Sequence, residues 1–423
     1  MVIRRTSTVT LIVILALVFP LVGIFHGLNF RCQAPPPGPD MLSAGVGYSV
    51  IETTTHLYAI AGEYQEMGSN HCDVLILCPD KKIHGGLGND SAQEIIECQD
   101  GGFALIGYTT SYGAGKADLW LLRTNSTGHH LWNKTFGTAE DEYGTALIRY
   151  QNNDYAIIGY GSGDNGNKQD VWVLRTDSMG NVLWNRTFGG SETDTGWSII
   201  LNAAGQLVIT GTTESFGAGD KDIWLLCLDG FGNHLWNQTF GGKDADRGWD
   251  VTLAHDGGYA IIGSTTSSRG NDTDIWLIRT DAAGNQIMNT TIGDTRDDEG
   301  LSIITTVQGD FAMTGYADGR ETIWFDRSAG YGAFFGGYQE HIFGTSIIEV
   351  SEGGFLIVGG INATSTENSR VVYWRLPSHY GPPEISLLWL IFSILYYGWP
   401  ILIVILVILA IMIWRKRTQK NLK

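Results

Sequence analysis

The chain has little cysteine, few basic residues in its middle part, and almost no helical periodicity outside its two ends. Its five cysteines are too few and too irregularly spaced for a disulfide framework or a zinc site. All 44 acidic residues lie between Asp40 and Glu384, whereas eight of the 27 basic residues lie outside, which leaves a formal charge of −25 in the middle. This charge excludes nucleic acid as a partner and favours cations, basic partners or simple solubility at a cell surface.

The cysteines leave two pairings open. Either Cys78 or Cys72 could form a disulfide with Cys98 in an exterior domain, and the sequence alone does not choose between them. Cys227 stands at a repeat position that holds arginine elsewhere. We therefore expect Cys227 to be a buried free thiol.

Long apolar runs occur only at the two ends of the chain. The first, residues 8–25 behind Arg4 and Arg5, predicts a signal-anchor or a signal peptide within residues 1–33. The second predicts a transmembrane helix over 385–414, followed by a basic tail at 415–423. Positive charge at both extremes predicts that both ends are cytoplasmic, unless the first segment is cleaved, and that the middle lies on the extracytoplasmic side of the cell membrane.

Between these ends the chain repeats itself. Trp120, Trp172, Trp224 and Trp276 stand 52 residues apart, each two positions after an aspartate. A fixed period of this length indicates one supersecondary unit copied in tandem. We expect the repeats to span 45–376, with a proline-rich spacer before them at 34–44 and a second spacer after them at 377–384.

Each repeat predicts four short antiparallel strands. In the fifth unit these begin with the apolar stretch GLSIITTV and continue with GGYAIIGSTTS and TDIWLIRTD, separated by turns rich in Gly, Asn and Asp. Four strands in about 50 residues are typical of a propeller blade. The sequence therefore predicts an all-β, seven-bladed β-propeller, with six or eight blades as alternatives, flanked by membrane helices.

Two motifs carry a family resemblance. GGYAIIGSTTS followed by DIWLIRT resembles the glycine-doublet and tryptophan blades of kelch-like propellers, and RTDSMGNVLWNRTFGG resembles the blade motif of quinoprotein-like propellers. Tandem propellers flanked by membrane segments are also similar to membrane-anchored surface proteins of archaea. The resemblance implies a fold and no quinone cofactor, because the ligand residues of the dehydrogenases are missing.

Acidic loops are the candidate binding site. They precede the innermost strands and are expected to surround the mouth of the central channel, where hard cations such as calcium take oxygen ligands. The same turns could instead use their carboxylates to bind their own amides. The candidates are Glu140, Asp141, Glu142, Glu192, Asp194, Asp244, Asp246, Asp297, Asp298 and Glu299.

Eight N-x-[ST] sequons are candidates for N-glycosylation in an exterior domain. Four of them recur at one repeat position, which could equally reflect a strand pattern. The eight are Asn89, Asn125, Asn133, Asn185, Asn237, Asn271, Asn289 and Asn362.

No catalytic constellation can be assembled from the sequence, so we name no catalytic residue. The favoured hypothesis is a non-enzymatic, membrane-anchored module that binds a protein or a glycan at the cell surface through variable loops. The alternatives are a glycan-active enzyme, a glycosidase or lyase with carboxylates at the channel mouth, and a structural coat or adhesion element.

Overall fold

The computed structural model describes residues 40–66, 68–162, 168–267, 272–293, 295–317, 320–327, 331–335, 342–361 and 370–376. The two apolar segments predicted to meet the membrane lie outside these ranges, as do Cys32, Asn271 and Asn362. Within them, no helix is long and apolar enough to cross a bilayer.

The described residues form seven four-stranded antiparallel sheets. The first four contain β2 (Val46–Glu52), β3 (Tyr58–Gln65), β4 (Cys72–Cys78) and β5 (Asp80–His84); β6 (Asp90–Glu97), β7 (Phe103–Thr109), β8 (Asp118–Thr124) and β9 (His130–Phe136); β10 (Glu142–Arg149), β11 (Tyr155–Ser162), β12 (Gln169–Thr176) and β13 (Val182–Phe188); and β14 (Asp194–Leu201), β15 (Leu207–Thr213), β16 (Asp222–Leu228) and β17 (His234–Phe240). A 3-10 turn, η1 (Gln151–Asn153), joins β10 to β11.

The remaining sheets continue the pattern. They contain β18 (Asp246–Leu253), β19 (Tyr259–Thr265), β20 (Asp274–Thr280) and β21 (Gln286–Ile292); β22 (Asp298–Thr305), β23 (Phe311–Ala317), β24 (Arg320–Arg327) and β25 (Tyr331–Phe335); and β26 (Ile342–Glu349), β27 (Phe355–Ile361) and β28 (Arg370–Leu376) with β1 (Asp40–Ala44). The prediction of an all-β propeller built from four-stranded antiparallel sheets is confirmed.

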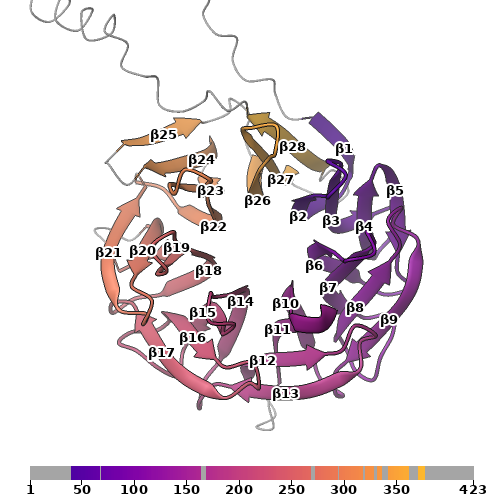
Figure 1. Ribbon diagram of the computed structural model, residues 1–423, viewed down its shortest axis with the longest axis horizontal. Coiled ribbons are helices and arrows are strands. Elements are labelled where there is room, and N and C mark those ends of the chain that lie inside the picture. Colours follow the sequence, from indigo (N-terminus) through magenta and orange to yellow (C-terminus); the bar gives the residue numbers. More distant parts are fainter. Residues whose placement is uncertain are drawn as a thin grey trace, which may run out of the picture. The chain divides into compact units, whose positions relative to one another are not determined.

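The first strand of each repeat lies innermost. Consecutive innermost strands contact one another from β2 through β26, and β2 in turn contacts β26, so the sheets close into a ring (Figure 1). In each sheet the strands follow one another outward in chain order, except in the last.

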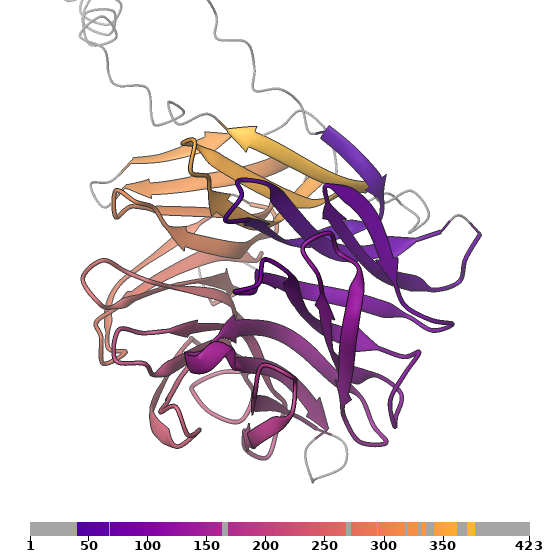
Figure 2. The ribbon, with the colours of Figure 1, turned by 45° about the vertical axis from the view of Figure 1, so that its right-hand side comes forward.

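The last sheet joins the two ends of the described chain. β1 pairs antiparallel with β28, with Asp40 opposite Tyr373 and Ala44 opposite Arg370, and both views show the two strands side by side (Figure 2). β1 lies within the segment 34–44 that the sequence suggested as a spacer. This part of the predicted spacer therefore supplies the fourth, outermost strand of the last sheet, which links the two ends of the described chain.

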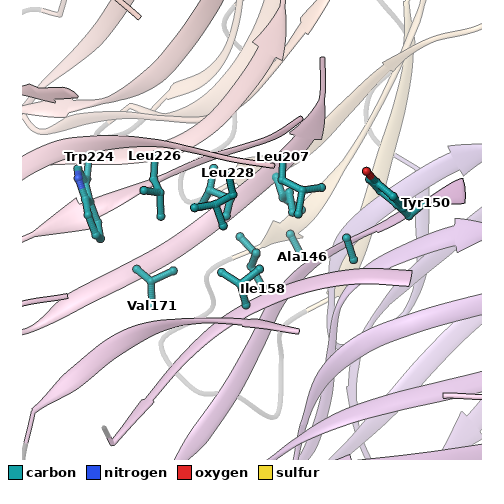
Figure 3. Close-up of a cluster of buried hydrophobic side chains, with 12 residues drawn as sticks. Ala146, Tyr150, Ile158, Val171, Leu207, Trp224, Leu226 and Leu228 are labelled. Atoms are coloured by element: carbon teal, nitrogen blue, oxygen red, sulfur yellow. The ribbon is translucent and has the colours of Figure 1, made fainter. Parts of the chain in front are cut away.

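Apolar clusters between neighbouring sheets hold the ring together. One cluster joins Ile158 and Val171 of the third sheet to Leu207 and Trp224 of the fourth (Figure 3). The central strands are apolar on both faces because each face packs against a neighbouring sheet; all seven residues of β8 and of β16 are buried. Burial of this kind contributes about 25 cal/mol per Å² of apolar surface.

One recurring contact between glycine and tryptophan explains part of the 52-residue repeat pattern. Gly232, which has a φ of +79°, lies against the indole of Trp184, and an added Cβ would come within 2.8 Å of that ring. Gly180 packs on Trp132 and Gly284 on Trp236 in the same way. Only glycine combines this conformation with so close an approach. Trp132, Trp184 and Trp236 are thus structural docking points for the next sheet's glycine.

The described cysteines form no disulfide. Cys72, Cys78, Cys98 and Cys227 are all free thiols. The disulfide that the sequence left open between Cys98 and either Cys78 or Cys72 is therefore absent. Cys227 is fully buried, as expected.

Candidate functional site

The acidic loops and the loops before the third strands share one face. Glu142 N–H donates to the carbonyl of Ala117, and Asp246 N–H donates in the same way to Lys221. Across these two loops Lys116 forms an ion pair with Glu140 at 2.8 Å. We name this side of the ring, where the innermost strands begin, the acidic face.

Several candidate carboxylates cap their own turns. Asp194 is buried and accepts hydrogen bonds from Gly190 N at 2.8 Å and from Ser215 Oγ at 2.7 Å. Asp246 makes the equivalent bonds with Gly242 N and Ser267 Oγ. These contacts, which all reach the Oδ2 atoms, are those of the turn-capping interpretation, because each joins a carboxylate to an amide of its own loop and a hydroxyl of the facing loop.

Glu142 belongs to the same class, since it accepts hydrogen bonds from the amide and the hydroxyl of Thr138, and Asp298 is buried at the corresponding position. Glu140, Glu192, Asp244 and Asp297 are exposed, while Asp141 and Glu299 are half-buried. In the described part of the chain, no group of three or more His, Cys, Asp or Glu side chains is arranged to hold a metal ion.

The repeated arginines also belong to the scaffold. Arg123, Arg175 and Arg279 each form an ion pair within their own sheet, with Asp100, Asp154 and Asp256 respectively. They therefore do not converge on a common ligand, in agreement with their regular spacing.

A cavity of about 420 Å³ lies around Arg123 between the second and third sheets. Its polar groups satisfy one another: Arg123 Nε donates to the Tyr155 hydroxyl at 3.2 Å, Arg123 also pairs with Asp100, and the Cys98 thiol lies 3.3 Å from the same hydroxyl. Because this arrangement is a variant of the repeated arginine contact, we assign it to packing.

A second cavity, of about 140 Å³, lies at the centre of the ring. Every innermost strand contains a β-bulge, and the cavity is lined by the bulge residue and the residue after it from all seven strands. We name the seven residues that directly follow the bulge residues the channel ring. Its members are Ser49, Glu94, Ala146, Ser198, Asp250, Ser302 and Ser346.

Channel-ring side chains link neighbouring sheets. Ser346 Oγ accepts a hydrogen bond from Val50 N, and Ser49 Oγ accepts one from Ile95 N, both at 3.4 Å. Where a carboxylate replaces serine, it accepts the same hydrogen bond from the neighbouring sheet: Glu94 accepts from Leu147 N and Asp250 from Ile303 N. Serine occupies four of the seven positions; Ala146, Glu94 and Asp250 depart from it, and only Glu94 and Asp250 do so with a carboxyl group.

Glu94 makes only part of the contacts available to a carboxyl group. Its Oε2 accepts a hydrogen bond from Leu147 N at 2.6 Å, and no group in the described ranges donates to Oε1. The pKa of Glu94 is raised to about 8. Burial is the largest cause and the nearby Asp250 acts in the same direction, whereas the Leu147 amide lowers the pKa. At neutral pH the side chain is therefore largely a neutral carboxyl group that can donate a hydrogen bond into the channel.

Asp250 is held more completely. Ser198 Oγ donates to its Oδ1 at 2.6 Å, Val251 N donates to the same oxygen, and Ile303 N donates to Oδ2 at 2.9 Å. Burial raises its pKa, while these donors lower it. A carboxylate bound by this many scaffold donors is positioned to connect sheets rather than to attack a substrate.

Aromatic side chains gather beside the channel toward the acidic face. Their ring centroids follow one another at 5.1, 5.4, 5.4 and 4.8 Å. All are half-buried, and the last two line the central cavity. We name this set the aromatic arc: Tyr108, Tyr143, Tyr160, Trp197 and Trp249.

Charged residues of both signs flank the arc. Arg247 and Glu299 lie at equivalent places on β18 and β22, and burial raises the pKa of Glu299 while Arg247 lowers it. On the other side, burial also raises the pKa of Glu63, which lies beside Tyr48. The mouth of the channel thus combines aromatic rings, carboxyl groups and one guanidinium.

Sequence reasoning missed both the channel ring and the arc. Their signal is visible when the innermost strands are aligned, because Glu94 and Asp250 stand where most repeats have serine, and Trp197 and Trp249 stand where others have Gln93 or Thr145. The bulge adds one residue to each strand, so simple alternation does not assign these side chains to the channel.

Comparison with solved structures supports the fold. Virginiamycin B lyase from Staphylococcus aureus, as a catalytically inactive variant with quinupristin, superposes with a TM-score of 0.52 at 14% identity and covers 80% of this chain and 98% of that chain. A selenomethionine-substituted form of the same lyase gives a TM-score of 0.50 at 13% identity, covering 80% of this chain and 99% of that one. These similarities show a β-propeller fold and carry nothing about activity.

At the level of sequence, no protein-family profile matches the chain. A curated protein, regulatory protein FlaEY from Caulobacter vibrioides, is 25% identical over 269 residues. That match covers 55% of this chain and 27% of FlaEY, so the chain spans about a quarter of the relative's length. Similar proteins therefore include a lyase and a protein named as regulatory.

Proposed function

We propose that the chain is a membrane-anchored, extracytoplasmic β-propeller, with each of the seven sheets as one blade, that binds a protein or a glycan at the cell surface without catalysis. Its repeat motifs suggest the kelch-like and quinoprotein-like type, in the manner of surface proteins of archaea. The observation that carries the proposal is the aromatic arc. Half-buried aromatic rings gathered at the rim of a shallow cavity are typical of recognition surfaces.

The direction of the chain supports an outward-facing site. β28 runs away from the acidic face, and β1 is antiparallel to it, so Asp40 and Leu376 both lie on the opposite face. Spacers leaving from that side toward the predicted membrane segments would leave the acidic face and the arc directed away from the bilayer. This geometry is the one expected of a tethered binding module.

Scaffold contacts argue against the enzymatic alternative. Glycoside hydrolysis requires two carboxyl groups free to exchange protons or attack the sugar. Glu94 and Asp250 share the central cavity and both have raised pKa values, which is the observation that favours an enzyme. However, Asp250 is held by three scaffold donors and Glu94 by one. We therefore favour binding over hydrolysis or a purely structural coat.

A pull-down with the purified full-length protein tests the proposal. The extract would come from the surface of its own cells, with calcium in one sample and EDTA in the other. We expect a discrete partner that is lost when Trp197→Thr and Trp249→Gln are combined, since other repeats use Thr and Gln at that position. Loss of the partner in EDTA alone would make the acidic loops a metal site. Equal recovery with the variant, or no partner in either buffer, would refute the proposal.

A further inference from the structure

We propose that the ligand of the channel mouth is a neutral saccharide chain whose sugar rings stack along the aromatic arc and whose terminal residue enters the central cavity. This inference deepens the proposed binding function and rests on it. Four properties of the site support it: its position, its dispensability for folding, its charge and its size.

The arc forms a continuous path from the second to the fifth sheet. Tyr108 and Tyr160 lie on second strands, whereas Tyr143, Trp197 and Trp249 lie on innermost strands. Successive centroids are 4.8 to 5.4 Å apart and the rings are tilted by 34° to 71°, so they pack on one another and form one continuous apolar surface. The apolar faces of pyranose rings stack on such surfaces, and their hydroxyl groups remain free to bind polar neighbours.

The fold does not require these aromatic residues. At the bulge position the first sheet has Tyr48, and four others use the smaller or aliphatic residues Gln93, Thr145, Leu301 and Thr345 with the same bulge. The two indoles at this position therefore add apolar surface to the channel, and the scaffold does not need that surface to fold. In addition, the indole N–H of Trp249 is covered from solvent and has no acceptor in the described part of the chain. A ligand hydroxyl oxygen is a suitable acceptor for it.

The charge of the mouth disfavours an anionic ligand, because Glu63, Glu299 and the acidic loops lie there, with Arg247 as a counter-charge. In the cavity, Glu94 is a largely neutral carboxyl group at pH 7 with one oxygen directed at no scaffold donor. The Asp250 carboxyl group is already bound by scaffold donors, Ser302 among them. Glu94 and Ser346 therefore present uncharged hydrogen-bonding groups, which match hydroxyl groups rather than phosphate.

Size decides how the ligand is bound. The cavity of 140 Å³ has room for about five water molecules at ~30 Å³ each. Pockets that enclose whole small molecules are larger, roughly 300–1,000 Å³. The cavity therefore accepts one terminal group, and the rest of an extended ligand must lie outside it on the arc.

The test is titration of the full-length protein in detergent with neutral oligosaccharides of glucose, mannose, galactose and N-acetylglucosamine, monitored by tryptophan fluorescence and calorimetry. We expect at least one series to bind more tightly as it lengthens to several sugars. Trp197→Thr and Trp249→Gln should each weaken binding about tenfold or more. Phe231→Ala, which removes an exposed aromatic ring from the turn between β16 and β17 on the face opposite the arc, is the matched control and should change binding less than twofold.

Thermal unfolding of each variant separates loss of binding from loss of folding, and Thr and Gln already occupy this position in other sheets. No binding of any neutral series at millimolar concentration, or equal binding by the tryptophan variants, would overturn the saccharide assignment. Preferential binding of an oligouronate or an oligolysine would overturn it too. A pull-down partner that depends on the arc, found with no oligosaccharide binding, would refute the saccharide and leave the binding module standing.

Discussion

At the scale of the residue, the repeat separates scaffold from site. Asp194 and Asp246 recur because they cap equivalent acidic loops, and the arginines recur because three sheets pair one with an aspartate. Glu94 has no such counterpart in most sheets. Residues that depart from the repeat at the channel are therefore the informative ones.

Glu94→Gln should change the pH dependence of stability. In the unfolded chain a glutamate titrates near pH 4.3, whereas the pKa of folded Glu94 is raised to about 8 by burial. The folded state thus holds its proton more tightly, so the favourable contribution is complete below about pH 4 and is lost as the pH rises through 8. We expect the wild type to lose about 1–3 kcal/mol over this range, less than the full shift implies because channel water screens the charge.

The measurement is the free energy of unfolding by denaturant at pH 5, 7 and 9. Glu94→Gln keeps the oxygen that accepts from Leu147 N and cannot ionise, so its stability should be flatter with pH. Glu140→Gln, at an exposed acidic-loop position, is the control and should retain the wild-type slope. An unchanged slope in Glu94→Gln would contradict the account of this carboxyl group.

A second prediction concerns the buried position where Cys227 replaces arginine. Cys227→Arg should destabilise the protein by about 3–5 kcal/mol, because it buries a cation without a partner. Adding Gln206→Asp should recover part of the loss, since Gln206 lies beside the Cys227 thiol and corresponds to Asp154, the partner of Arg175. Unfolding midpoints of the single and double variants measure the coupling, and a double variant no more stable than Cys227→Arg would show that the pair does not form.

At the scale of the element, ring closure depends on a short strand. In β1, Ser43 is paired with Val371 of β28. Ser43→Pro removes a backbone donor and fixes φ, so we expect a loss of about 1–3 kcal/mol, whereas Ser43→Ala keeps the strand and should cost less than ~0.5 kcal/mol. Thermal unfolding compares the two. Equal stability of the two variants would show that β1 contributes little to closure.

The outermost strands provide a prediction about modification. Asn133, Asn185, Asn237 and Asn289 occupy one position on β9, β13, β17 and β21, and all four are exposed. We expect glycans on them in the protein isolated from its own cells. Mass spectrometry should show a stepwise loss of mass as each is changed to Gln, and the unmodified polypeptide mass at all four would refute glycosylation of this rim.

Much of the element pattern was predictable. The repeated Asp–x–Trp motif located the third strand of the clean sheets, whereas β1, inside the predicted spacer, was not assigned as a strand. The bulge was not predictable, because a single extra residue leaves no mark in the apolar pattern. It turns Trp197 and Glu94 toward the channel, which is why the acidic loops, and not the channel ring, were the candidates suggested by the sequence.

At the scale of the whole molecule, the ring has two unlike faces. The acidic face carries the capped loops, the arc and the channel mouth, and the opposite face carries both ends of the described chain. In the proposed function, the negative charge of the middle segment promotes solubility and long-range selection of partners, and the arc contacts the ligand.

The central claim is that the ligand binds at the channel mouth on the acidic face. Hydrogen–deuterium exchange of the full-length protein, with and without the ligand recovered from its cell surface, tests it most directly. The account predicts slower exchange in the first residues of β14 and β18 and in the loops before them, with β13 and β17 unchanged. Protection confined to the outer strands, or to the cavity around Arg123 on the opposite face, would contradict it.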